Sequence, residues 1–384
     1  MKFPATNSLP SFLRSKTNND LIVKLVCACW LVTKLVCYKL WLAYRVFPLV
    51  PVHDSLAGLP VLLHTVLFGV SLLCMALLVF FPGRKIAVVL LLAELISCML
   101  DQNRWQPWEY QFVFMLAGYV FIRDEKKCRF SWQLIIVGLY FFSGLYKCSS
   151  SFIHNVWNNL FLQQFFGIHS AGKWLLRFGY VIPLVEIFIS IALCFGRTRK
   201  LAVVLLLTMH LFNLVLFGPL GLNINSVIWA WNILMPLLAY RLFYKDGLHL
   251  FNKNLWKPSF AWLMLLAWWV LPWLQLTGRW DKYLSGVLYS GRIEQLYICT
   301  DNGLANLQLG PCFVKSDKSM SCTTSLSVTK WAIQEMNTAP YPEYRVYKTI
   351  ALAWNKLYPD TANRFYLYRA GFTAAAKPFL VDER

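Results

Sequence analysis

Long apolar stretches alternate with short polar or basic clusters from residue 21 to residue 276. A helix needs about 20 apolar residues to cross the hydrocarbon core of a bilayer, and several of these stretches approach that length. The pattern predicts about nine membrane-spanning helices. They are expected at 21–44, 58–81, 86–100, 110–122, 131–147, 176–195, 201–217, 226–240 and 260–276.

After residue 276 the pattern changes, because polar residues return and short alternating runs appear. Strands are predicted at 295–300 and 364–369, and helices at 328–337 and 343–357. The expected fold is therefore an all-α polytopic membrane helical bundle with a small α+β C-terminal extracytoplasmic domain. Its expected parts are a cytoplasmic amino-terminal segment (1–20), the transmembrane domain (21–276) and the C-terminal domain (277–384).

Composition agrees with a membrane protein, with 58% hydrophobic residues, only 14% charged residues and a mean hydropathy of +0.50. The net charge of +19 lies mostly in short clusters between apolar stretches, which is typical of orientation against an anionic cytoplasmic leaflet. No basic stripe with base-stacking aromatic residues is present, so the expected partner is the lipid bilayer and not nucleic acid.

The distribution of Lys and Arg predicts the orientation of the chain. Basic residues gather at 84–85, 123–129, 197–200 and 241–257 and near the start, whereas the opposite short loops hold only Arg45, Arg104, Lys173 and Arg177. The positive-inside rule then places the amino terminus in the cytoplasm and the C-terminal domain outside. The first predicted span is interrupted by Lys24, Lys34 and Lys39, so an interfacial amphipathic helix is the competing interpretation.

The cysteines show no spacing typical of a metal site, and those inside predicted spans are expected to pack as small apolar residues. In the C-terminal domain, Cys312 and Cys322 enclose a short polar loop. They could form a disulfide in an oxidising compartment, with Cys299 as the rival partner.

Ionisable side chains inside apolar stretches are functional-site hypotheses, because lipid penalises each of them by several kcal/mol unless a partner compensates. Lys147 ends the fifth predicted span, with Ser143 and Gly144 one turn earlier on an adjoining face that a ligand or a helix could approach closely. A desolvated Lys147 could act as a base. The alternative is that its long side chain extends to the membrane interface.

Three further residues belong to the same hypothesis. Glu186 and His210 lie near the middle of their spans, and Asn213 follows His210 at i+3 on one helix face. Together they could bind a ligand or relay a proton, although a buried histidine bonded to a neighbour is an equally good interpretation. Glu94 and Glu186 could also be structural, either protonated or paired with another helix.

The stretch Tyr140-Phe-Phe-Ser-Gly-Leu-Tyr-Lys147 follows the pattern aromatic-small-Gly-x-x-Lys and continues through Phe152, Trp157 and Phe161. It resembles the segment of the vitamin K-dependent gamma-carboxylase family that carries the catalytic base. The similarity extends over about residues 20–275, the region called the HTTM (horizontally transferred transmembrane) domain. Its other parts are Leu59, Pro60 and His64, residues 82–85, Met209 to Asn213 and residues 218–231.

The resemblance implies a multi-span helical domain with Lys147 as an active lysine near the outer face, where the family oxidises reduced vitamin K and carboxylates a glutamate. The chain departs from the carboxylases at Arg104 to Tyr110, which has no histidine where they have an Asn-His pair, and in its shorter tail. Residues 280–291 and 341–343 are instead similar to the tails of bacterial members, which implies a bacterial inner membrane.

Two functions follow as hypotheses. The first is a membrane redox or transferase enzyme that uses a lipid-soluble quinone, with Lys147 as base, Glu186 and His210 beside it, and Ser143, Gly144 and Asn213 binding the cofactor. The second is a non-catalytic scaffold or accessory protein whose tail binds an extracytoplasmic protein partner. A transporter is a weaker alternative, because no pair of matching broken helices is evident.

Overall fold

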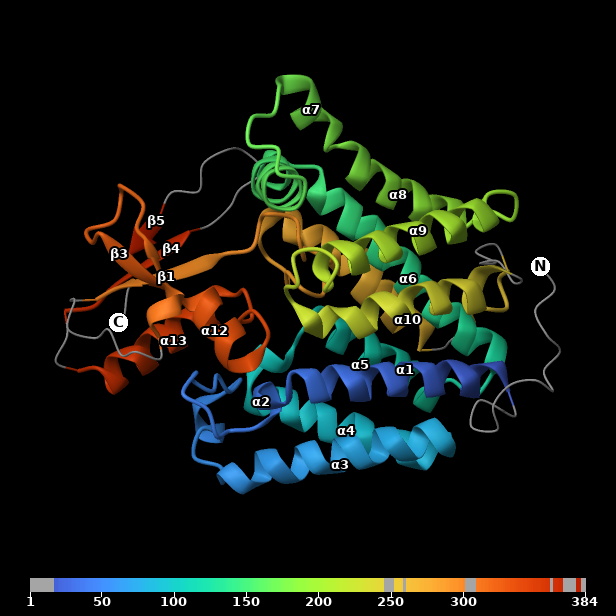
Figure 1. The fold of residues 1–384 in the computed structure, drawn as a ribbon. Helices are drawn as coiled ribbons and strands as arrows, with labels where there is room; N and C mark the ends of the chain where they lie inside the picture. Colours follow the sequence, from blue (N-terminus) through green and yellow to red (C-terminus); the bar gives the residue numbers. More distant parts are fainter. Residues whose placement is uncertain are drawn as a thin grey trace.

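The computed structural model describes residues 17–244, 252–257, 260–300, 309–359, 362–368 and 378–380. Most of the expected amino-terminal segment, residues 1–20, lies outside this part of the chain. Long helices lie side by side and form a bundle, and a small sheet with two helices stands at one end of it (Figure 1). We call this end of the bundle the sheet end.

The bundle contains long α-helices joined by short turns and shorter 3-10 or π-helical pieces. The longer elements are α1 (Asn18–Val36), α3 (Val61–Phe80), α4 (Arg84–Leu100), α5 (Pro107–Phe121), α6 (Glu125–Lys147), η5 (Phe152–Phe165), α8 (Val181–Leu193), α9 (Arg199–Phe217) and α10 (Trp229–Ala239). The short ones are α2 (Tyr38–Trp41), η3 (Asp54–Leu56), η4 (Gln102–Arg104), α7 (Lys173–Phe178), η6 (Ser226–Ile228), η7 (Tyr240–Tyr244), α11 (Ala261–Leu265), η8 (Leu266–Val270) and η9 (Leu271–Thr277).

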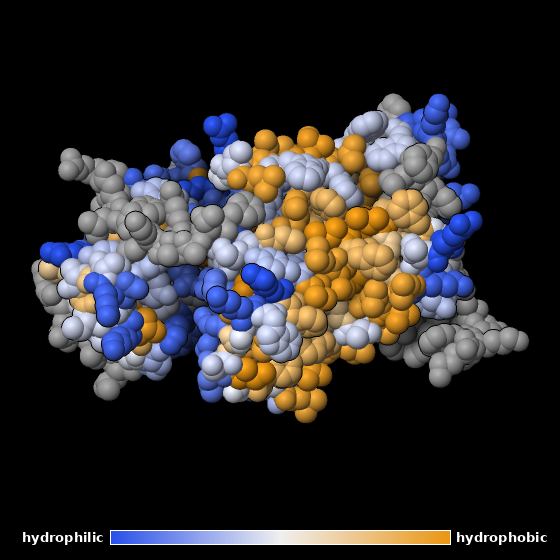
Figure 2. All heavy atoms as spheres, turned by 90° about the horizontal axis from the view of Figure 1, so that it is seen from above, coloured by the Kyte–Doolittle hydropathy of each residue, from blue (hydrophilic) through white to orange (hydrophobic). Residues whose placement is uncertain are grey.

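Each of the nine predicted apolar segments contains helix, but the number of spans is not confirmed. Five helical segments in the described residues are long and apolar enough to cross a membrane: 61–80, 125–147, 173–193, 199–217 and 226–244. The segment 261–277 is apolar but shorter, and α4 and α5 have only 17 and 15 residues. A broad band of hydrophobic side chains covers the bundle between more hydrophilic ends (Figure 2).

The first helix lies inside the bundle, against α3, α5 and α10. Its start is fixed by a capping box, in which the Thr17 side chain accepts from the Asp20 N–H and the Asp20 carboxylate accepts from the Thr17 N–H. Lys34 is buried in an ion pair with Glu94, with 2.6 Å between Nζ and Oε2, and its Nζ lies 3.0 Å from the centre of the Trp41 ring. These contacts explain how Lys34 fits an apolar helix: it neutralises a carboxylate of α4.

The C-terminal part contains a five-stranded antiparallel sheet in the order β2-β3-β1-β4-β5, with two helices. Its elements are β1 (Gln295–Cys299), β2 (Phe313–Lys315), β3 (Thr324–Ser327), α12 (Val328–Met336), α13 (Tyr344–Leu357), β4 (Arg364–Tyr368) and β5 (Pro378–Leu380). The predicted strands at 295–300 and 364–369 and both predicted helices are confirmed within a residue or two. The central strand β1 and its neighbour β4 contribute four buried residues to the hydrophobic core: Leu296, Ile298, Phe365 and Leu367.

The C-terminal part is fastened to the sheet end of the bundle by hydrogen bonds to the turn between α4 and α5. The Arg345 Nε donates to Gln102 Oε1 (2.7 Å), the Tyr341 N–H donates to Asn103 Oδ1 (3.1 Å), and the Gln106 amide donates to the Ala339 carbonyl (3.1 Å). Besides these hydrogen bonds, one continuous cluster of buried hydrophobic residues runs from the bundle into the sheet.

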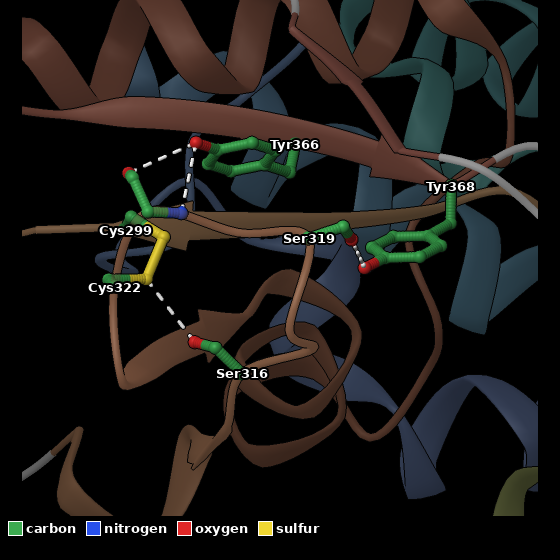
Figure 3. The surroundings of a disulfide bond; sticks show 7 residues. Cys299, Ser316, Ser319, Cys322, Tyr366 and Tyr368 are labelled. Atoms are coloured by element: carbon green, nitrogen blue, oxygen red, sulfur yellow. Dashed lines mark hydrogen bonds between the residues drawn. A yellow bond between two sulfur atoms is a disulfide. The ribbon is translucent and has the colours of Figure 1, made fainter.

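The expected disulfide between Cys312 and Cys322 is wrong, because the structure joins Cys299 to Cys322 (Figure 3). Cys299 ends β1, and the loop between β2 and β3 brings Cys322 to within 5.8 Å of it, measured between the Cα atoms. Cys312 is buried directly before β2, and its thiol donates to Gln334 Oε1 at 3.0 Å. The register of the sheet decides the partner.

Candidate functional site

A cavity of about 390 Å³ lies at the sheet end of the bundle, between α6, η5, α8, α9 and α10. The segment 286–289, which leads to the first strand, completes its wall. In Figure 1, η5 is the green coil seen end-on beside α7, so it crosses the ends of the neighbouring helices. Most of the lining is apolar, and a few polar side chains face the space from α6, α8, α9 and α10. This combination is typical of sites for small organic ligands.

Helix α6 places Tyr140, Ser143 and Lys147 on one wall of the cavity. Residues spaced by three, four or seven positions share a helix face, since a turn takes 3.6 residues. The helix begins at Glu125 and ends at Lys147, and its N-cap is Asp124, whose carboxylate accepts from the Lys127 N–H at 2.9 Å. Sequence spacing therefore explains why these three polar side chains, together with the apolar Leu139, face the cavity from α6.

Lys147 does not extend to the surface; it forms an ion pair inside the cavity. Its Nζ lies 2.6 Å and 2.8 Å from the two carboxylate oxygens of Glu186 and 2.9 Å from Ser143 Oγ. The two charged side chains are only 12% and 7% exposed. All three ammonium donors can thus be directed at oxygen atoms, which offsets the cost of removing the charges from water.

Gly144 brings α6 and α8 close enough for this pair to form. A Cβ atom at Gly144 would lie 2.7 Å from the Pro183 carbonyl oxygen and 2.8 Å from Ile187 Cγ1. Gly144 thus packs against α8 and does not line the cavity, unlike the other five predicted site residues. Its contribution is the contact of two backbones, which sets the distance between Lys147 and Glu186.

His210 belongs to a second polar group in the same cavity. Its Nε2 lies 2.6 Å from the Tyr140 hydroxyl, and its Nδ1 lies 2.7 Å from Asn232 Oδ1. The Asn213 amide donates to the same Asn232 oxygen at 3.3 Å. Tyr140, His210 and Asn232 are all buried, and each of them lines the cavity.

The segment 286–289 is pressed against α6 by a glycine in the left-handed region. Gly286 has φ +73°, and a Cβ atom there would lie 3.2 Å from the Ser143 backbone nitrogen. Only glycine combines this φ with so close an approach at little cost. Tyr289 follows on the same segment, and its hydroxyl accepts a hydrogen bond from the Asn225 amide.

The stretch from Arg104 to Tyr110 does not bring a second base to the cavity. Arg104 is fully buried and donates to Ser97 Oγ (2.9 Å) and to the Trp41 carbonyl (2.9 Å), and its Nη2 lies 2.8 Å from His64 Nδ1. His64, one of the residues in the family resemblance, thus belongs to this separate network between α3 and α4. Of the stretch, only Pro107 lines the cavity.

The site can exchange protons in an apolar surrounding. An ammonium and a carboxylate in contact can share a proton, and a low local dielectric strengthens every polar contact around them. Among the residues that the structure describes, no group of three or more His, Cys, Asp or Glu side chains is placed to hold a metal ion.

Sequence reasoning did not include Tyr140 and Asn232 among the site residues. Tyr140 stands seven residues before Lys147, and this spacing is a signal that it shares the same helix face. Asn232 lies in an apolar helix, where a buried amide needs a partner, yet only the fold identifies His210 as that partner.

The cavity and the bundle define a class: a mostly helical protein with several apolar helices that are compatible with an integral membrane protein. Comparison with protein-family models, curated proteins and solved structures finds no match.

Proposed function

We propose that this chain is an integral membrane enzyme of the HTTM and gamma-carboxylase-like kind. Its cavity would bind the head group of a lipid-soluble quinol, and Lys147 would act as the base toward a quinol hydroxyl. The observation that carries the proposal is the buried ion pair of Lys147 and Glu186 on the wall of an apolar cavity. A lysine that served only as an interfacial anchor would have no need of such a partner.

The residues of the cavity fit a quinol. Its volume of about 390 Å³ lies within the range usual for small-molecule sites, and its apolar walls suit an aromatic ring. Ser143, Asn213 and the ion pair offer polar atoms for ring oxygens. A bound quinol would supply an acidic hydroxyl and two reducing electrons.

The ion pair explains how a lysine can accept a proton in this site. Glu186 takes a proton from the Lys147 ammonium, with which it is in contact, and leaves a neutral amine. Lys147 then accepts the hydroxyl proton: the O–H bond breaks, its electron pair stays on oxygen, and a new N–H bond forms. Ser143 keeps the amine in place through its contact at 2.9 Å.

We also propose that the sheet end faces away from the cytoplasm, in the inner membrane of a bacterium. Two observations support this orientation: the basic residues gather at the opposite loops, and the disulfide between Cys299 and Cys322 is of a kind that persists in oxidising compartments. In intact cells, a membrane-impermeant thiol reagent should label these two cysteines after mild reduction.

The test is aerobic oxidation of menadiol, a quinol without a tail, by the detergent-solubilised full chain. The native protein should accelerate the loss of quinol absorbance, because a quinol that has lost a proton reacts faster with dioxygen. Lys147→Ala should lower the rate by about 100-fold or more, the usual contribution of a general base. The control is Lys173→Ala, at an exposed lysine at the start of α7.

Background rates in both the native chain and Lys147→Ala would overturn the enzyme proposal. In that case a non-catalytic scaffold, the alternative expected from the sequence, would be the better description of the protein.

A further inference from the structure

The cavity has two polar groups at different depths along α6. Lys147 stands near the end of the helix, and Tyr140 stands two turns earlier on the same face. With a rise of 1.5 Å per residue, their Cα atoms are separated by about 10 Å along the helix axis. A ligand with polar atoms at opposite ends of an aromatic ring could therefore meet one group at each end.

The hydrogen bonds of the inner group fix where its protons are. The Asn232 Nδ2 donates to the Ile228 carbonyl at 2.9 Å, so the Oδ1 atom is the one that faces His210. A carbonyl oxygen only accepts, so His210 Nδ1 must carry a hydrogen. In a neutral ring the other nitrogen, Nε2, then has a free electron pair, and the Tyr140 hydroxyl donates to it at 2.6 Å.

Tyr140 is therefore a hydroxyl in the cavity that already has a proton acceptor behind it. The acceptor is held in one tautomer by Asn232, and the Asn213 amide reinforces the position of Asn232 by donating to the same oxygen. No carboxylate among the described residues bonds to the imidazole ring, and with a neutral ring this group carries no formal charge, in contrast to the ion pair of Lys147 and Glu186.

We infer that Tyr140 is a second catalytic residue. It contacts a second hydroxyl of the ligand, accepts the proton of that hydroxyl and gives its own proton to His210. Asn232 acts as a positioning residue. This inference rests on the proposed function and assigns the second hydroxyl of the quinol to the inner polar group. A phenol with one hydroxyl would use only one of the two polar groups.

The proton transfer at the inner group balances as follows. The ligand O–H bond breaks, and its electron pair remains on the ligand oxygen. The proton goes to the Tyr140 oxygen as the proton of Tyr140 moves to His210 Nε2. The positive charge then lies on the imidazole ring, whose Nδ1–H continues to donate to Asn232.

The test compares the binding of menadiol with that of its monomethyl ether, which has one free hydroxyl, under anaerobic conditions. The native chain should bind menadiol about 10-fold more tightly than the ether, the value of one well-placed hydrogen bond. Tyr140→Phe should reduce this ratio to less than about 2-fold and leave the affinity for the ether unchanged. Tyr146→Phe is the matched control, because Tyr146 lies on the same helix and donates to the Pro272 carbonyl outside the cavity.

A preference for menadiol that persists in Tyr140→Phe would overturn the inference. If Lys147→Ala still abolished menadiol oxidation, the proposed function would stand without it. Failure of the native chain to bind either compound would overturn both.

Asn232 is tested by a pair of variants. Asn232→Leu removes the acceptor for His210 Nδ1 and should lower the kcat of menadiol oxidation by about 10-fold with an unchanged Kd. Asn232→Asp keeps an acceptor oxygen and should restore kcat to within about 3-fold of the native value, because one hydrogen bond decides the tautomer. Equal losses of kcat in both variants would exclude the positioning role.

Discussion

At the scale of single residues, Lys147 and Glu186 show how a membrane-embedded charge is tolerated. Each of the two would be costly by itself, and their contact makes the site neutral while leaving both groups able to exchange a proton. The contribution of the pair to stability and the proposed role of Lys147 as a base can therefore be separated by substitution.

Glu186→Leu leaves the lysine unpaired and should lower the free energy of unfolding by about 3–5 kcal/mol. The double variant Lys147→Met with Glu186→Leu replaces both charges by apolar groups and should recover most of this loss. It should nevertheless have no menadiol oxidation above background. Chemical unfolding in detergent measures the first effect; a double variant as unstable as the single one would contradict the prediction.

Gly286 and Gly278 form a second comparison at this scale. Both have a left-handed backbone, with φ +73° for Gly286 and φ +71° for Gly278. Only Gly286 packs closely against a neighbouring element, which is α6. Replacement by alanine should cost about 1 kcal/mol of stability at either position, because of the backbone conformation. Only Gly286→Ala should also weaken menadiol binding, since it moves the wall of the cavity. Equal effects of the two variants on binding would contradict this.

Whether a residue of the candidate site could be predicted from the sequence depends on the free-energy cost of placing its side chain in apolar surroundings. Lys147 and Glu186 were recognisable because lipid penalises a charge, so each demanded an explanation. Tyr140 and Asn232 are neutral, and a tyrosine or an asparagine in an apolar helix has many ordinary explanations. Their roles depend on contacts between α6, α9 and α10, which the sequence does not reveal.

At the scale of helices and strands, the contact of α6 with α8 decides the geometry of the ion pair. Gly144 permits this contact, since any side chain there would meet the Pro183 carbonyl. Close helix packing through small residues is a usual device in membrane bundles. The two helices cannot separate without changing the distance between Lys147 and Glu186.

Gly144→Ala should therefore reduce menadiol oxidation and lower the unfolding temperature, because a Cβ atom placed 2.7 Å from backbone oxygen forces the helices apart. The control is Gly69→Ala in α3, where nothing lies within 4 Å of the added atom. That variant should leave both measurements nearly unchanged. Full activity of Gly144→Ala would show that the ion pair tolerates a wider helix separation.

The positions of the membrane helices followed from the length of the apolar stretches, because burial in lipid or protein demands apolar side chains over such lengths. The number of spans did not, since α4 and α5 are shorter than a bilayer requires, and length then no longer separates a span from a buried helix. The disulfide partner depended on the register of strands such as β3, whose residues 324–327 carry no strong pattern.

At the scale of the whole molecule, Asp281 joins the bundle to the C-terminal part. Its carboxylate accepts from the Tyr110 hydroxyl at 3.2 Å and from the Leu284 N–H at 2.7 Å. Burial, the main cause, raises the pKa of Asp281 to about 6. The folded protein thus holds a proton on this carboxyl at pH values where the unfolded chain has released it.

This shift predicts a pH dependence with a definite sign. A carboxyl whose pKa is raised on folding contributes stability below its unfolded pKa of about 3.9 and loses that contribution as the pH rises through about 6. The total change should be about 3 kcal/mol. Asp281→Asn should remove it. The measurement is the free energy of unfolding in detergent between pH 4 and pH 7. If this free energy falls with pH as steeply in Asp281→Asn as in the native chain, the prediction is wrong.

The segment 286–289 has a consequence for how the protein is made. It belongs to the wall of the cavity, yet the ribosome reaches it only after all the helices that carry Lys147, Glu186 and His210. A nascent chain that has already inserted those helices still has an incomplete pocket. The cavity is therefore complete only after the carboxyl-terminal portion has been translated and has docked, and a truncated product that lacks this portion also lacks one wall of the cavity.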